Sequence, residues 1–407
     1  MGESLRVALV LGTTSGGTGR HVRMLAAGLI RHGHRVVVIG PRSTEESFDF
    51  TGAGARFVEV PVSDRPHPVN DARAVAAIRR ATREADVVHA HGLRAGALAA
   101  LGLVGGRARL VVTLHNALTA SGAIGAVYGV LERIVARRAD LVLGVSRDLT
   151  ERMTALGARR VDLAVVPAPP LRPTKRTAAE VRAELLGENG DAAPGDGASG
   201  SGGPGDGASG SGAPGDGVSG SGAPGDAGRV AAQEAAGRPI VLSNVRLAQQ
   251  KGLDLLLDAA RGPWPEPVPL FVIAGDGPLR EELQRRIDAE RLPVRLLGWR
   301  DDVPDLLAAA DVALWPSRWE GQPLSMSEAL MAGVPVVATE VGGIPDLLAG
   351  AGLLVPYGDA EAMRRAVRQA LERWEELARA AAERGRALPD ERAAIDAVLT
   401  VYPVRGR

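Results

Sequence analysis

The sequence predicts an α/β protein in which two doubly wound parallel-sheet domains face each other across a cleft. Short β-branched runs alternate with amphipathic helical segments in both halves of the chain. Near-continuous apolar strands separated by helices are typical of a parallel sheet that is covered on both faces. The chain has 407 residues, of which 45% are hydrophobic, and this is enough to form two cores.

The first half contains seven segments with strand character. These are Arg6 to Gly12, Arg35 to Gly40, Arg56 to Val60, Val87 to His91, Leu110 to His115, Asp140 to Val145 and Asp162 to Val166. Helical patterns fill most of the gaps between them. We therefore expect a Rossmann-like N-terminal domain over residues 1–172.

The second half repeats this alternation. Its expected strands are Ile240 to Asn244, Pro269 to Gly275, Val294 to Leu297, Val312 to Trp315, Val336 to Ala338 and Leu353 to Val355. A long helical run, Asp359 to Arg384, and a shorter one, Asp390 to Leu399, follow. We expect a second Rossmann-like domain over residues 239–388 and a final helix within residues 389–407.

A low-complexity segment separates the two halves. The unit PGDGASGSG recurs with a ten-residue period from Pro194 to Asp226, almost without large apolar side chains. Burial of apolar surface in such a segment does not offset the entropy lost on ordering. We expect a crossover helix and a disordered surface insertion over residues 173–238.

The composition excludes several classes of function. Lys and Arg together number 48, as do Asp and Glu, so no net charge attracts nucleic acid or an anionic membrane over a distance. The absence of cysteine excludes disulfides, thiolate metal sites and thiol nucleophiles. The start of the chain lacks the pattern of a signal peptide, and Ala95 to Val104 is shorter than the roughly 20 residues that span a bilayer. We expect a cytoplasmic protein without a nucleic-acid partner, and leave open a peripheral contact with the inner face of the cell membrane.

A glycine-rich loop, GTTSGGTG, follows the first strand over Gly12 to Gly19 and precedes a helix expected to begin near Arg20. Backbone amides at such a helix N-terminus can face an anion. The alternative is a turn that only lets strand and helix pack. The second strand ends in Gly40, Pro41 and Arg42 without an acidic residue, which argues against nicotinamide dinucleotides.

Two histidines, His89 and His91, close the fourth strand, where ligands of parallel sheets are commonly bound. Strand alternation places both on one face, but no third metal ligand follows at a suitable spacing. We interpret His89 as a structural core histidine.

Two cations, Arg246 and Lys251, lie in the loop after the first strand of the second half. Fixed positive charges at a strand end can stabilise a departing diphosphate without a metal. The alternative is that both are solvated surface charges.

Two acids, Glu320 and Glu328, stand with seven residues between them in the segment Pro316 to Leu348. Pro323 suits the start of a helix and Gly333 its left-handed end, so Glu320 falls in the preceding loop and Glu328 about one turn inside the helix. Both carboxylates could accept hydrogen bonds from sugar and ribose hydroxyls.

At these residues the sequence resembles the retaining glycosyltransferases of family four, the group 1 type, whose GT-B architecture has two facing Rossmann-like domains. The hallmark is a Glu, seven residues and a Glu within a segment like EGQPLSMSEALMAGVPVVAT, followed by a turn like Gly342 to Pro345. The resemblance covers both halves of the chain. It implies that Glu328 binds the donor ribose and that Glu320 lies against the transferred sugar. In related proteins the final helix crosses back onto the first domain, so we expect Asp390 to Tyr402 to pack there.

The resemblance also implies roles for other positions. Arg246 and Lys251 match a diphosphate-binding pair in the context R-L-x-x-x-K-G, and AGDGP at Ala274 to Pro278 is equally typical of the family. The remaining implied donor-site or catalytic positions are Gly16, Gly17, His91, Leu297, Gly298, Arg300, Gly321, Gln322, Pro323 and Leu324.

The sequence departs from the family pattern at two places. Gln322 stands where a Phe is common, which puts the donor sugar in doubt, and the usual P-N-G-V-D is replaced by Pro167 to Pro170. Neither departure removes a residue of the expected catalytic set, which is His91, Arg246, Lys251 and Glu320.

The resemblance implies retaining, metal-independent transfer of a hexose-type sugar. The donor would be a UDP-, GDP- or ADP-sugar bound by the C-terminal domain, and no other cofactor is expected. The acceptor hydroxyl, bound by the N-terminal domain, could belong to a lipid carrier, a glycan or a small metabolite. Two alternatives stay open: a sugar-nucleotide epimerase or hydrolase on a similar scaffold, and a non-catalytic nucleotide-sugar-binding partner.

Overall fold

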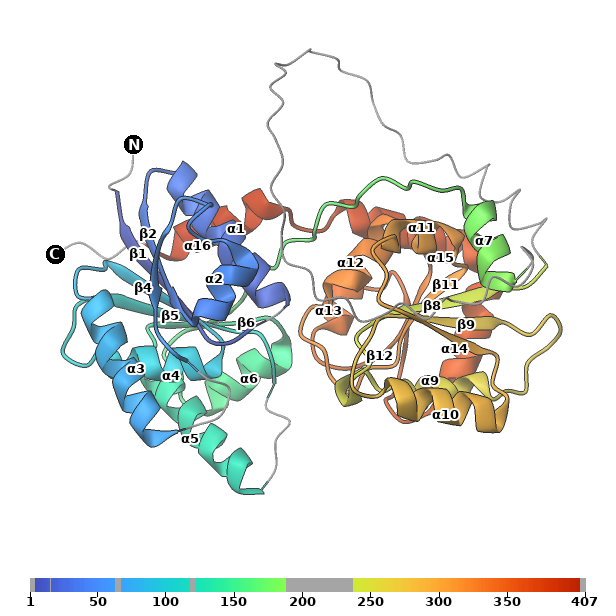
Figure 1. Ribbon diagram of the computed structural model, residues 1–407, viewed down its shortest axis with the longest axis horizontal. Helices are drawn as coiled ribbons and strands as arrows, with labels where there is room; N and C mark the ends of the chain where they lie inside the picture. The colour runs from blue at the N-terminus through green and yellow to red at the C-terminus, as the bar shows by residue number, and fades with distance from the viewer. Residues whose placement is uncertain (1–3, 15, 63–66, 118–121, 188–236, 403–407) are drawn as a thin grey trace, which may run out of the picture.

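The computed structural model describes residues 4–14, 16–62, 67–117, 122–187 and 237–402. The repeat predicted over residues 194–226 lies outside these ranges. The described chain forms two α/β lobes that stand side by side, one from the first half of the sequence and one from the second (Figure 1). Each lobe is built around one parallel sheet, as the sequence predicts.

The N-terminal sheet has seven strands in the order β3-β2-β1-β4-β5-β6-β7. Their bounds are β1 Arg6–Leu11, β2 Arg35–Gly40, β3 Arg56–Glu59, β4 Val87–His91, β5 Arg109–Leu114, β6 Leu141–Gly144 and β7 Val161–Leu163. The strand order reverses between β1 and β4, and ligands of open parallel sheets bind beyond the carboxyl ends of the strands at such a point.

Helices cover both faces of this sheet. They are α1 Gly17–Arg31, α2 Arg42–Phe48, α3 Pro68–Ala81, α4 Leu93–Gly102, α5 Gly122–Arg138 and α6 Arg147–Ala155. Alternate residues of β1 serve two separate cores: Val7 and Leu9 belong to the core shared with α1, and Ala8 and Val10 to the core shared with α3 and α4. This two-sided burial explains why the strands are almost wholly apolar.

The C-terminal sheet has six strands in the order β10-β9-β8-β11-β12-β13. Their bounds are β8 Ile240–Asn244, β9 Leu270–Ala274, β10 Val294–Gly298, β11 Val312–Trp315, β12 Val336–Thr339 and β13 Leu353–Val355. The order reverses between β8 and β11, which repeats the arrangement of the first domain.

The helical elements of this half are η1 Gln249–Lys251, α9 Leu253–Ala260, α10 Arg280–Glu290, α11 Val303–Ala309, α12 Leu324–Met331, α13 Ile344–Leu348, α14 Ala360–Glu372 and α15 Trp374–Arg386. The expected single helix Asp359 to Arg384 is wrong, because the chain breaks at Arg373, where φ is −106° and ψ is 32°. Trp374 Nε1 donates a hydrogen bond to the Asp311 carbonyl at 3.0 Å, and α15 packs on α12. Tertiary packing thus overrides the continuous helical pattern.

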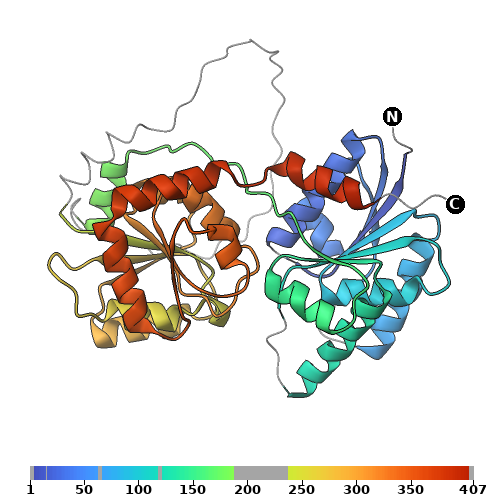
Figure 2. The same ribbon diagram turned by 180° about the vertical axis from the view of Figure 1, so that it is seen from behind.

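Two helices each pack on a domain other than the one that they directly follow in the sequence. Helix α7, Ala178–Leu186, follows the N-terminal domain but packs in the C-terminal core, and α16, Glu391–Val401, follows the C-terminal domain but lies along α1 (Figures 1 and 2). A Cβ on Gly28 of α1 would lie 2.2 Å from Ile395 Cδ1, so the glycine permits this close packing. The chain therefore crosses between the lobes twice.

Candidate active site between the two domains

A cavity of about 350 Å³ lies where the two domains and the crossing segments meet. Its walls come from α1, from the ends of β5 and β6, from the segment after β7 and from the loop before α12. The lining residues are Gly17, Thr18, Arg20, His21, Met24, His115, Asn116, Val145, Val166, Pro167, Ala168, Pro169, Pro170, Glu320, Gly321, Gln322, Leu324 and Glu391. Five of the predicted site positions, namely Gly17, Glu320, Gly321, Gln322 and Leu324, are among them.

One wall is the N-terminus of α1, which begins at Gly17 and not near Arg20 as expected. The N-cap residue Gly16 provides no side-chain hydrogen bond, and the first turn contains no acidic residue. The first amides of a helix have no partner within the helix, and the helix dipole favours negative charge there. This wall can therefore receive an anionic group.

The opposite wall carries the carboxylate of Glu320, which is 4% exposed. Its Oε1 accepts a hydrogen bond from Lys251 Nζ at 2.5 Å and another from Ser317 Oγ at 2.8 Å. The backbone N–H of Gly343 donates to the Glu320 carbonyl at 3.0 Å. The Glu320 loop is thus fixed both by its side chain and by its backbone.

The two predicted cations differ in their surroundings. Lys251 ends η1 and is held against Glu320, with 20% of its side chain exposed. Arg246 is exposed in the loop after β8, and among the described residues it forms no ion pair. Neither lines the cavity itself. Lys251 is therefore next to the cavity wall because it contacts Glu320. The exposed Arg246 side chain is not held by an ion pair with any described residue.

Glu328 lies half-buried one turn into α12, and Pro323 occupies the N-cap position of that helix without a side-chain hydrogen bond. Burial raises the pKa of Glu328, and the positive charges of Arg20 and Arg172 oppose this shift. Arg20 belongs to α1 and also lines the cavity. A carboxylate of the C-terminal domain thus lies within electrostatic range of a cation of the N-terminal domain.

The predicted catalytic His91 does not line the cavity and is 2% exposed. Its Nδ1 lies 3.2 Å from Nε2 of His115, which does line the cavity. The ring of His21 packs edge-on against both, with centroid separations of 5.7 and 5.8 Å. Burial lowers the pKa of His21 to about 4 and that of His115 to about 3, so both rings are neutral at pH 7.

The structural interpretation of His89 is confirmed. It is fully buried, and its Nδ1 and Nε2 lie 2.7 Å from the Tyr402 hydroxyl and from Thr113 Oγ1, respectively. Burial lowers its pKa to about 3.

The buried His89 makes stability depend on pH. In the unfolded chain its pKa is near 6.5 and in the folded chain about 3, so between pH 6.5 and pH 3 mainly the unfolded state takes up the proton. The free energy of unfolding is therefore highest above pH 6.5 and decreases as the pH falls. The decrease is about 2 kcal/mol per such histidine between pH 7 and pH 5. We expect His89→Gln, which does not titrate, to reduce this loss in urea unfolding followed by circular dichroism. His32→Gln, at an exposed position after α1, is the control and should keep the full loss; an equal reduction in both variants would contradict the assignment.

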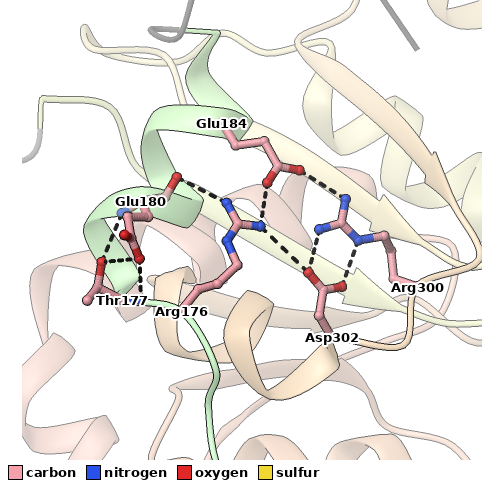
Figure 3. Close-up of polar contacts among 6 residues, drawn as sticks. All are labelled: Arg176, Thr177, Glu180, Glu184, Arg300 and Asp302. Carbon is pink, nitrogen blue, oxygen red and sulfur yellow. Dashed lines mark hydrogen bonds and ion pairs between the residues drawn. The ribbon is translucent and has the colours of Figure 1, made fainter. Parts of the chain in front are cut away.

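The predicted Arg300 takes part in an ion network instead of facing the cavity (Figure 3). Its guanidinium binds both oxygens of Asp302 at 2.7 and 2.5 Å and Glu184 Oε1 at 3.0 Å, while Arg176 binds Glu184 Oε2 at 2.6 Å. The hydrogen bonds to Asp302 raise the pKa of Arg300. The side chain of Arg300 therefore ties the loop after β10 to α7.

Leu297 and Gly298 end β10, away from the cavity lining. The Gly298 carbonyl accepts a hydrogen bond from the Gly275 amide at 2.7 Å, which joins the AGDGP turn to the end of β10. The two segments singled out in the sequence thus lie side by side at the carboxyl ends of the neighbouring strands β9 and β10.

Within the described ranges, no group of three or more His, Cys, Asp or Glu side chains is arranged to hold a metal ion. Over the same residues, no helix combines the length and the apolar character that crossing a bilayer demands.

Comparison with known proteins identifies the family. Residues 16–169 match the model of the glycosyl transferase 4-like domain, and residues 235–373 match that of glycosyl transferases group 1. The chain belongs to the group 1 glycosyltransferases. The expected family and the two-domain GT-B fold are thereby confirmed.

Individual relatives of this glycosyltransferase chain match over shorter stretches. The 2-deoxystreptamine N-acetyl-D-glucosaminyltransferase of Streptomyces fradiae is 37% identical over 147 residues, which is 33% of this chain and 34% of the relative. The lipopolysaccharide core mannosyltransferase LpsB of Rhizobium meliloti is 37% identical over 130 residues, 29% of this chain and 37% of the relative. The chain thus spans about a third of the length of these curated relatives.

The fold extends over the whole chain. The crystal structure of Anabaena HepE in complex with UDP and glucose has a TM-score of 0.71 and 18% sequence identity, and the match covers 98% of this chain and 99% of HepE. At this identity the likeness establishes the GT-B fold.

Sequence reasoning missed several cavity residues of this group 1 glycosyltransferase. His115 and Asn116 follow β5, which pairs in register with β4, so their place beside His91 could have been inferred from adjacent parallel strands. His21 lies inside α1 and carries no such signal. Trp319, the residue before Glu320, was also missed, and it contacts the other domain.

Proposed function

We propose that this chain is a retaining glycosyltransferase that moves a hexose-type sugar from a nucleotide-sugar donor to an acceptor hydroxyl. The observation that carries the proposal is the Lys251–Glu320 pair, which lies at an interdomain cavity opposite the uncapped N-terminus of α1. A nucleotide sugar combines hydroxyls with a diphosphate, and these are the groups that such a carboxylate, cation and helix end can bind.

Lys251 and Arg246 would stabilise the diphosphate as it leaves. Lys251 is already fixed next to the position proposed for the sugar, and Arg246 is exposed at the adjoining strand end and can turn toward a ligand. Cations held where negative charge develops lower the barrier to bond cleavage without a metal. The proposal therefore requires no metal or other cofactor.

We propose a front-face displacement for the transfer step. The acceptor oxygen forms a bond to the anomeric carbon on the side from which the diphosphate oxygen departs, and the hydroxyl proton passes to that leaving oxygen. The described acids that line the cavity are Glu320, held by Lys251 and Ser317, and the exposed Glu391. Glu320 would thus hold the sugar instead of attacking it.

The donor can be identified by thermal stabilisation. A ligand that binds only the folded state raises the melting temperature. The UDP-, GDP- and ADP-sugars should therefore differ in the rise of melting temperature that they produce. UDP-glucose is the first donor to test, because HepE was crystallised with UDP and glucose. Incubation of the stabilising donor with lipid-carrier, glycan and small-molecule acceptors then tests transfer. Consumption of the donor without an acceptor would favour an epimerase or hydrolase, and binding without any consumption would favour a non-catalytic partner.

Glu328 should bind the ribose of the donor. We expect Glu328→Gln to weaken nucleotide binding by roughly 10- to 150-fold, because a hydrogen bond to a charged acceptor contributes roughly 1.5–3 kcal/mol. Burial raises the pKa of Glu328, so the wild-type affinity should begin to fall at a higher pH than it would with an exposed Glu. The variant should lose this pH dependence. Calorimetric titration with the nucleotide measures both effects, and Glu340→Gln, at an exposed position after β12, is the control. Unchanged affinity of Glu328→Gln would refute the role.

A further inference from the structure

We propose that Trp319 is a positioning residue that fixes the Glu320 loop against the N-terminal domain and holds the two domains together around the cavity. The inference rests on the proposed function, in which Glu320 faces the transferred sugar. Trp319 directly precedes Glu320 in the chain, so a displacement of one moves the other.

The indole of Trp319 belongs to the core of the other domain. It is 9% exposed and joins the buried apolar cluster that contains Val145 and Leu149 of the N-terminal domain. Burial of an aromatic ring of this size is among the largest single contributions to an interface. A residue of the C-terminal domain thus completes a cluster that belongs to the N-terminal one.

A hydrogen bond sets the orientation of this indole. Trp319 Nε1 donates to Asp148 Oδ2 at 2.8 Å, and Asp148 lies in the first turn of α6. A second link between the domains, Arg147 Nε to Asp346 Oδ1 at 2.7 Å, has an arginine side chain that is 70% exposed. Exposed ion pairs contribute roughly 0–1 kcal/mol, so the buried indole dominates this contact.

The backbone around Glu320 has no space in which to move independently of Trp319. A Cβ on Gly321 would lie 2.7 Å from Val145 Cγ2 and 2.9 Å from the His115 carbonyl oxygen, across the domain boundary. On the other side, a Cβ on Gly342 would lie 1.9 Å from the Glu320 carbonyl oxygen and 3.0 Å from Trp319 Nε1. The loop is therefore enclosed between the N-terminal domain and the turn at Gly342.

This arrangement links domain contact to the geometry of the site. Within its own domain the carboxylate of Glu320 is held by Lys251 and Ser317, whereas its distance from His115 and Asn116 depends on the domain contact. Trp319 is the buried side chain that fixes this contact. Loss of the indole should leave donor binding intact and misplace the donor relative to the acceptor.

The kinetic test compares Trp319→Phe with Arg147→Ala. Trp319→Phe keeps an apolar ring and removes the N–H, and we expect kcat to fall roughly tenfold while the Kd for the nucleotide changes less than twofold, because misalignment of reacting groups slows transfer. Arg147→Ala should change neither value. In a double-mutant cycle, Asp148→Ala should add little to Trp319→Phe. Unchanged kcat, or an equal loss of nucleotide affinity and kcat, would overturn the proposal.

A distance measurement tests the contact without relying on activity. The chain has no cysteine, so spin labels can be placed at Arg83→Cys and Arg285→Cys, exposed positions of the two domains. We expect Trp319→Ala to shift the distance distribution toward longer, broader separations and Arg147→Ala to leave it unchanged; a wild-type distribution for Trp319→Ala would overturn the proposal. If the wild-type protein used no nucleotide sugar, the proposed function would fail, and these distances would still decide whether Trp319 holds the domains together.

Discussion

The Lys251→Ala variant is expected to lose turnover by about 10²–10³-fold, the loss typical of removing one fixed electrostatic stabiliser from an active site. Lys251 Nζ lies 2.5 Å from Glu320 Oε1 at the cavity wall, so the charge is already in place before the donor arrives. Turnover is measured by product formation at saturating donor. The control is Lys175→Ala, which removes the second of the two lysines from an exposed position. Wild-type transfer by Lys251→Ala would contradict the assignment.

The same variant separates catalysis from stability. Without Lys251 the buried carboxylate of Glu320 keeps only Ser317 as a side-chain partner, and we expect a destabilisation of about 1–3 kcal/mol. The double variant Lys251→Ala/Glu320→Gln removes the unpaired charge and should recover most of the free energy of unfolding, but not turnover. Recovery of both together would mean that Lys251 acts only through folding.

The second large effect is expected for Gly342→Ala. The φ of Gly342 is +53°, and an added Cβ would lie 1.9 Å from the Glu320 carbonyl oxygen, so the Glu320 loop must move. We expect the free energy of unfolding to fall by about 2–4 kcal/mol, through strain and displacement of packed backbone. A displacement of about 1 Å at a catalytic group can reduce turnover by about 10²-fold, and we expect a loss of that order.

Gly358→Ala is the matched control for this substitution. Gly358 also has a positive φ, +91°, but no atom lies within 4 Å of the position that an added Cβ would take. Its substitution adds backbone strain without a clash, at a cost of about 1–2 kcal/mol. Equal losses of stability and turnover in both variants would show that the contact with Glu320 has no special role.

The strands and their order of alternation could be predicted because each carries its own apolar pattern. β1, buried on both faces, reads as an unbroken apolar run, and the structure confirms it as a strand. The break at Arg373 could not be predicted, since residues on either side keep a helical pattern, and the contacts made there, such as the hydrogen bond from Trp374 to a carbonyl 63 positions earlier, are long-range. Element type is therefore local information, whereas the break depends on tertiary contacts.

The candidate site was predictable where one loop contains several of its residues. Glu320, Gly321, Gln322 and Leu324 come from a single stretch of sequence and line the cavity together. The contact of Trp319 with Asp148 joins positions 171 residues apart and has no sequence signature. Such pairings arise only from the relative placement of two domains.

The helix α16 has a consequence for how the protein is made. Ile395 and Val398 of α16, together with Tyr402 directly after it, complete the core of the N-terminal domain, and the Tyr402 hydroxyl is hydrogen-bonded to the buried His89. Domains generally fold as they emerge during synthesis, beginning with the N-terminal one. In this protein the core of the N-terminal domain therefore stays incomplete during synthesis, until the second domain and α16 have been translated. A truncation before α16 should therefore damage the domain that is synthesised first.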